Sequence, residues 1–314
     1  MVTRKIVQHG SSSLTVTLPK KWVEKNNLKK GNEIKVDEKG TYLVIGGKGK
    51  HIKSKTTITI PNDMPSSALM HYTAALYRAG YDHVKFIFST AEAYNNIAKV
   101  TGNDLNSWDI IENKKNSCVI DSISSLDHTQ FENVLKRLLY GITELSTDSL
   151  EAIKNKNIEE IKLAQTKENT INRNANFCER ILIKEGYKEP DKIPFLFYII
   201  KELENIGDEY NGICYCYLKD GKINKKTLEL YKEINDLLNE FKKLYLKEEA
   251  QKPLNIQNAA ELHSKIKEKQ KIGYKLLAGN QTDDCILHHL ITVLRKTKSC
   301  LGCLFSIMIA EKKN

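Results

Sequence analysis

The chain has 314 residues, of which 40% are hydrophobic and 28% are charged, a mixture that is typical of globular proteins and excludes an intrinsically disordered one. Its length favours two or three domains. The formal net charge is +10, and residues 1–55 carry 13 Lys and Arg against 4 Asp and Glu, so nearly all the excess lies there. This distribution indicates a polyanion partner for the N-terminal segment and not for the rest.

Membrane insertion is not expected. No apolar run follows the basic residues of Met1–Ile6, and the stretches Ile193–Ile200 and Cys300–Ala310 are shorter than the ~18–20 residues that span a bilayer. We therefore expect a cytoplasmic protein without a signal peptide. Its seven cysteines, an odd number, are expected to be reduced thiols.

The first 48 residues predict a small β-rich domain. Its elements are strands at Arg4–His9 and Leu14–Leu18 around a Gly10–Ser13 turn, a helix at Lys20–Asn26 after Pro19, and strands at Glu33–Val36 and Tyr42–Ile45. Hairpins of this size cannot bury a core alone. Residues 1–48 are therefore expected to dimerise.

Residues 52–124 alternate between strand and helix patterns and predict a small α+β connector domain. The expected strands are Thr56–Ile60, His83–Phe88, Asp109–Asn113 and Cys118–Asp121, and the expected helices are Ser66–Arg78 and Thr90–Val100.

From residue 127 onward the pattern is helical, and the apolar spacing is that of amphipathic helices. Breaks divide the region into six long helices, near residues 128–154, 158–185, 193–218, 225–248, 255–278 and 284–311. The sequence predicts two tandem three-helix bundles, at 127–220 and 222–314. The fold class is therefore multidomain and mainly α.

The N-terminal motif resembles the AbrB/SpoVT family. It runs from Arg4-Lys-Ile-Val-Gln-His-Gly-Ser-Ser-Ser through Leu18-Pro-Lys-Lys-Trp22 to Leu28-Lys-Lys-Gly-Asn-Glu-Ile34. The resemblance implies a DNA-binding domain in which two chains interleave their hairpins into one swapped-hairpin β-barrel.

Eight residues of this motif are the candidate DNA contacts: Arg4, Lys5, His9, Ser11, Ser12, Ser13, Lys20 and Lys21. The basic side chains would meet phosphates, and the histidine and serines would add hydrogen bonds. Serines replace the arginines usual in the family's turn, and Val23 and Glu24 stand in the helix, so weak, salt-sensitive binding is expected. The alternative is that these lysines form only a solvated face.

Ile199–Ile213 resembles the signature helix of the PhoU family, with Glu204 and Asp208 four residues apart on one helix face. Like charges at this spacing repel unless a cation joins them. Glu144, Asp148 and Glu168 complete the candidate metal ligands, and the resemblance implies a divalent cation or iron. The alternative is a set of solvated carboxylates. In the last helix Arg295 and Ser299 take the matching positions, so we expect no second site.

The cysteines offer a weaker signal for a metal. Cys214 and Cys216, like Cys300 and Cys303, lie in apolar helical stretches without zinc-type spacing, and we expect small buried core residues. His288-His289 is expected at a helix surface and core edge.

No nucleophile–base pair or phosphate-cradling loop is present, so we do not expect an enzyme. The leading hypothesis is a homodimeric regulator of phosphate uptake that binds DNA and contacts a phosphate transporter's ATPase subunit or a sensor protein. The PhoU resemblance supplies the phosphate connection, and this fusion suggests an archaeal source. One alternative is an adaptor of a transporter or sensor kinase whose arm only dimerises. Another is a helical module that stores or senses the metal itself.

Overall fold

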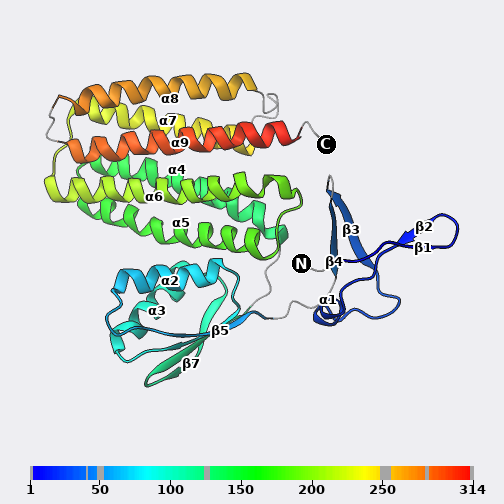
Figure 1. Ribbon diagram of the computed structural model, residues 1–314. Helices are drawn as coiled ribbons and strands as arrows, with labels where there is room; N and C mark the ends of the chain where they lie inside the picture. The colour runs from blue at the N-terminus through cyan, green and yellow to red at the C-terminus, as the bar shows by residue number, and fades with distance from the viewer. Residues whose placement is uncertain are drawn as a thin grey trace. The chain divides into compact units, whose positions relative to one another are not determined.

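The computed structural model describes residues 3–39, 42–47, 53–123, 128–247, 256–279 and 283–311. The chain forms two compact units, Met1–Ser54 and Lys55–Asn314 (Figure 1). The protein is mainly helical, as the sequence predicted. Among the described helices, none combines the length and apolar character that crossing a bilayer requires.

The N-terminal unit consists of two hairpins and a short helix. Its elements are β1 (Val7–His9), β2 (Ser13–Thr15), α1 (Lys20–Lys25), β3 (Ile34–Lys39) and β4 (Tyr42–Gly47). Among the described residues, β1 pairs with β2 and β3 pairs with β4, both antiparallel, and the two hairpins form separate sheets. The described strands of one chain therefore do not close the expected barrel, which would require strands of a second chain.

Apolar side chains of this unit lie open to solvent. Ile6 is 69% exposed, Leu14 70% and Leu43 64%, and Val7, Val16 and Val36 are also exposed. Two-stranded hairpins that leave such residues in water are marginally stable alone.

The second unit begins with a four-stranded sheet covered by two helices. Its elements are β5 (Lys55–Thr59), α2 (Ser66–Arg78), β6 (His83–Ile87), α3 (Ala91–Asp104), β7 (Trp108–Lys114) and β8 (Ser117–Ser122). The strand order is β5-β6-β8-β7, with β5 parallel to β6 and the other pairs antiparallel. Side chains of both layers form one apolar core that includes Tyr77, Phe86 and Ile97.

Six long helices follow, close to the predicted ranges. They are α4 (Phe131–Lys154), α5 (Ile158–Lys184), α6 (Ile193–Asp220), α7 (Lys225–Leu246), α8 (Ile256–Leu277) and α9 (Asp284–Glu311), with 3₁₀ turns η1 (His128–Gln130) and η2 (Pro190–Lys192). Asn157 caps α5, Asn224 caps α7, and Gly221 ends α6 in the left-handed region with a φ of 63°.

The two sets of three helices share one continuous apolar core, built largely where α6 packs along α9 (Figure 1). Buried hydrogen bonds join the sets as well. Tyr210 on α6 donates to Asn235 on α7 (2.8 Å), and the amide of Asn235 donates to the carbonyl of Ser146 on α4 (2.6 Å). The expected domains at 52–124, 127–220 and 222–314 thus all lie within one compact unit.

A buried ionic contact joins the sheet layer to α5. Arg180 is 1% exposed, and it donates to Asp82 Oδ1 (2.8 Å), as does Lys184. The Arg180 guanidinium also lies 4.6 Å from the ring centre of Tyr77, and it donates to the Tyr77 carbonyl. Asp82 therefore pairs with two cations in a largely dry contact.

Candidate functional site

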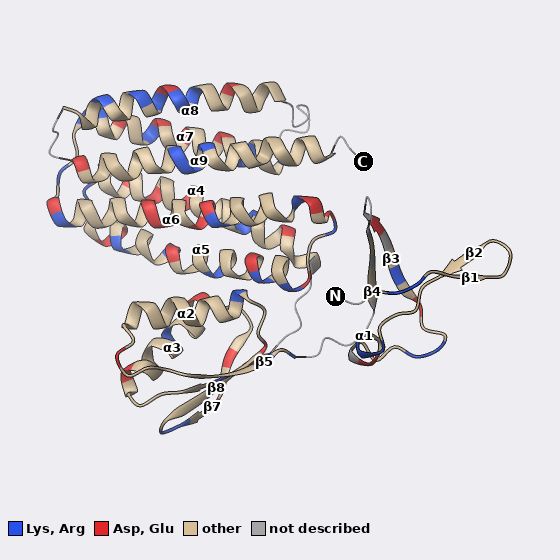
Figure 2. Ribbon diagram, in the orientation of Figure 1, with Lys and Arg blue, Asp and Glu red and all other residues tan. Residues whose placement is uncertain are grey.

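The candidate DNA contacts of the N-terminal unit are all exposed to solvent. His9 and Ser13 face each other in the β1–β2 register, on either side of a turn in which Gly10 has a φ of +74°. Lys20 and Lys21 lie in the first turn of α1, where Figure 2 shows basic positions. Nζ of Lys20 lies 3.8 Å from Oε1 of Glu24. The structure thus presents two sets of donors, one at a hairpin tip and one on a helix.

The second unit has a different charge pattern. Along α4–α9, basic and acidic positions are mixed (Figure 2), in agreement with the near-neutral composition of residues 56–314. Candidate sites in the helices must therefore be local clusters rather than a broad field of one sign.

One such cluster contains three of the five predicted metal ligands. Glu204 and Asp208 lie on α6, and Glu168 lies on the facing helix α5. Burial of its carboxyl group, followed by the neighbouring Glu204 and Glu168 carboxylates, raises the pKa of Asp208 to about 7, although the residue as a whole is exposed to solvent. Burial and the same kind of repulsion raise the pKa of Glu168.

Polar neighbours only partly compensate these carboxylates. Lys201 donates to Glu204 (2.6 Å), and Asn211 donates to Glu168. The side chain of Asn172 also hydrogen-bonds Glu168, while its buried Oδ1 has no hydrogen-bond partner in the described part of the chain. The raised pKa values of Asp208 and Glu168, together with the unpartnered oxygen of Asn172, a residue that hydrogen-bonds Glu168, describe an oxygen donor set that suits a hard cation.

The helices α5 and α6 approach closely at this cluster because Gly207 has no side chain. A Cβ at Gly207 would lie 2.9 Å from Cγ2 of Ile171. Gly207 therefore allows the close packing of the two helices that carry Glu168 and Glu204.

The other two predicted ligands have a different partner. Lys167 lies 2.5 Å from Asp148 and 3.6 Å from Glu144, so an ion pair already joins the two carboxylates of α4. Both line a polar hollow of about 300 Å³ together with Asp236 of α7. The structure thus does not bring Glu144 and Asp148 into the Glu168–Glu204–Asp208 cluster.

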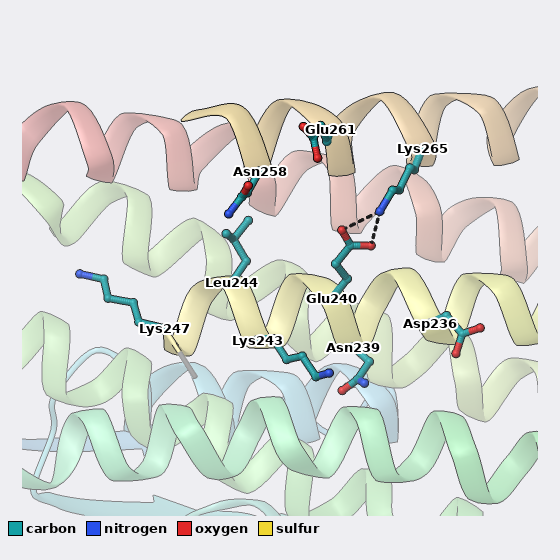
Figure 3. Close-up of a pocket in the computed structure, with 9 residues that line it drawn as sticks. All are labelled: Asp236, Asn239, Glu240, Lys243, Leu244, Lys247, Asn258, Glu261 and Lys265. Carbon is teal, nitrogen blue, oxygen red and sulfur yellow. Dashed lines mark hydrogen bonds and ion pairs between the residues drawn. The ribbon is translucent and has the colours of Figure 1, made fainter. Parts of the chain in front are cut away.

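A larger hollow of about 460 Å³ lies between α7 and α8 (Figure 3). Lys265 donates to both carboxylate oxygens of Glu240, at 2.9 and 3.0 Å. Three lysines and three carboxylates line this hollow: Lys243, Lys247, Lys265, Asp236, Glu240 and Glu261. Because these charges balance, the hollow offers no net attraction to an anion.

Among the described residues, only Cys216, Cys285 and His289 bring three ligand atoms of His, Cys, Asp or Glu within 4.8 Å of one another. Cys216 and Cys285 form a disulfide, so the expectation that all cysteines are reduced is wrong for this pair. The residues are 69 positions apart, and only the packing of α6 on α9 brings them together. A sequence signal was available in Cys285 and His289, which lie four apart on one face of α9.

Residues 7–57 match the family model described as antidote-toxin recognition MazE, bacterial antitoxin. This match supports the N-terminal part of the predicted resemblance, because it identifies an AbrB-like swapped-hairpin domain in this segment. Comparisons with curated proteins and with solved structures found no match.

Proposed function

We propose that this protein is a non-catalytic, DNA-binding transcription regulator that acts as a homodimer through its N-terminal unit. The match of residues 7–57 to the MazE model carries the proposal. The open apolar side chains of both hairpins, among them Leu14 and Leu43, support pairing with a second chain. The net charge of residues 1–55 supports a polyanion partner.

Binding to DNA is proposed to be weak and salt-sensitive. Lysines contact phosphates as point charges, and each such contact releases counterions. The exposed Lys20 and Lys21, with His9 and the serine turn, would position the dimer on the duplex rather than read its sequence.

The test is duplex binding measured against salt, with fragments of the organism's own genomic DNA as the probe. K20A/K21A should weaken binding and reduce the slope of log K against log salt by about 2 for each subunit of the dimer that contacts the duplex, since each lost phosphate contact contributes about 0.9. The matched control is K225A/K226A, which removes two exposed lysines from the first turn of α7. Lys225 pairs with a glutamate four residues later, as Lys20 does. Equal slopes for both double variants would contradict the proposal.

We further propose that the helical unit binds a divalent cation or iron at Glu168, Glu204 and Asp208. The raised pKa of Asp208 and the unpartnered oxygen of Asn172 support this. The carboxylate oxygens would have to move closer together around the ion, because they do not form a group within 4.8 Å.

Thermal unfolding with added Mn²⁺ or Fe²⁺ tests the cation. E204Q and D208N should lose the stabilisation by the ion, whereas D148N should retain it because Asp148 is already paired with Lys167. If only D148N loses the stabilisation by the ion, the cation binds at the carboxylates of α4 instead. Elemental analysis of the purified protein distinguishes a metal that stays bound through purification from one that binds reversibly and is sensed.

The link to phosphate uptake rests on the resemblance of Ile199–Ile213 to PhoU and on the two sets of three helices. On this proposal the helical unit contacts a phosphate transporter's ATPase subunit or a sensor protein. Chromatin immunoprecipitation under phosphate limitation distinguishes the regulator from an adaptor whose arm only dimerises. Enrichment at phosphate-transport promoters supports the regulator, and a genome-wide blank supports the adaptor.

A further inference from the structure

We propose that Cys216, Cys285 and His289, once the disulfide is reduced, form a binding site for a thiophilic divalent metal ion such as Zn²⁺. The three ligand atoms already lie within 4.8 Å of one another. Cys216 comes from α6, and the other two come from α9. This site shares no residue with the carboxylate cluster and uses different ligand atoms, so an experiment can refute one of the two metal sites without refuting the other.

The backbone places His289 directly against α6. A Cβ at Gly212 would lie 2.7 Å from Nε2 of His289, so only glycine lets the imidazole approach this closely. Cys216 lies one helical turn beyond Gly212, and Cys285 lies one turn before His289. The spacing on both helices therefore directs one thiol from each toward the same imidazole.

A carboxylate fixes the orientation of this imidazole. Glu209 Oε2 lies 2.7 Å from Nδ1 of His289, and both side chains are largely buried. When Nδ1–H donates to Glu209, Nε2 carries the lone pair and is free to bind a metal. A histidine whose other ring nitrogen donates to a carboxylate in this way is the usual arrangement around protein-bound zinc.

The donor set selects the metal. Two thiolates and one imidazole suit Zn²⁺ rather than Mg²⁺ or Ca²⁺, which prefer oxygen. Cys216 is buried, but Cys285 is exposed, so water can supply a fourth ligand. Binding would cross-link the first set of three helices to the second.

The disulfide and the metal exclude each other because both need the same sulfur atoms. A phosphine reductant gives two electrons to the S–S bond and becomes the phosphine oxide with the oxygen of water, and the two sulfurs each take up one proton. Zn²⁺ then displaces both protons from the thiols as two Zn–S bonds form.

Titration of the phosphine-reduced full-length protein with Co²⁺ tests the site. We expect one equivalent to give a near-ultraviolet thiolate-to-cobalt charge-transfer band that Zn²⁺ abolishes. C285S and C216S should lose the band, H289A should weaken binding by at least tenfold, and E209Q should weaken it by about tenfold. C303A is the matched control, because it removes a partly buried thiol elsewhere on α9 and should leave the band unchanged.

A second measurement needs no variant. Zn²⁺ should slow the alkylation of Cys285 by N-ethylmaleimide at least tenfold in the reduced wild-type protein, as followed by mass spectrometry. Unchanged alkylation, no cobalt band in the reduced wild-type protein, or a full band in C285S with intact helical circular dichroism would each overturn the proposal.

Discussion

The two units of this protein manage their apolar residues in opposite ways. The N-terminal unit leaves Ile6, Leu14 and Leu43 more than half exposed on two separate hairpins. In the second unit, six helices close around one core in which residues such as Leu138, Ile206 and Leu287 are inaccessible. The difference teaches that the second unit contains the contacts for its own stability, whereas the first requires contacts from outside itself.

The largest loss of stability is expected from D82A in the second unit. The substitution leaves Arg180 and Lys184 without their shared carboxylate, and Arg180 is 1% exposed. We expect the free energy of unfolding to fall by about 3–5 kcal/mol in chemical denaturation. E240A, which breaks the exposed pair with Lys265, should cost less than about 1 kcal/mol. Equal effects of the two variants would contradict the ionic contact as described.

An intermediate loss is expected from G207A. The added methyl would lie 2.9 Å from Cγ2 of Ile171, so the Ile171 side chain or the two helices must shift, at a cost of about 1–3 kcal/mol in urea denaturation. G302A is the control, because Gly302 lies in α9 with nothing within 4 Å of the added carbon. That variant should gain up to about 1 kcal/mol from helix propensity. A loss in G302A would show that the contact with Ile171 is not the cause.

A smaller effect depends on pH. The pKa of Asp208 is about 7 in the folded protein against 3.8 without the fold, so the folded state holds a proton that the unfolded state releases between these values. Stability should therefore fall as pH rises from about 4 to about 7. D208N should show a shallower fall in melting temperature over this range, without added metal. Identical profiles would refute the raised pKa.

The smallest effect on unfolding is expected from L14K in the N-terminal unit. The helical transition should change by less than about 0.5 kcal/mol, while sedimentation should show a change from dimer to monomer. L163K is the matched control, since Leu163 on α5 is 65% exposed and Leu14 is 70% exposed. If the wild-type protein sediments as a monomer, the claim that the N-terminal unit requires contacts from outside itself is wrong.

The sequence predicted local structure better than contacts between distant residues. Apolar spacing and breaks such as Gly221 mark helix ends because they act within one turn, and α2 begins and ends at the predicted residues. Contacts between helices depend on which helix faces align, and spacing along the chain does not encode that alignment. The ion pair of Lys167 with Asp148 and the disulfide of Cys216 with Cys285 are two such contacts. The described strands of the N-terminal unit form two separate hairpins, so the barrel stays a prediction that depends on a second chain.

The continuous core of the six helices has a consequence for dissecting the protein. A fragment ending at Gly221 would strip α9 from α6 and bring the apolar side chains of α6 that α9 covers into water. Such a fragment would carry an apolar stripe along its longest helix and would tend to aggregate. The two sets of helices should therefore melt in a single transition, and a ligand bound to either would protect both.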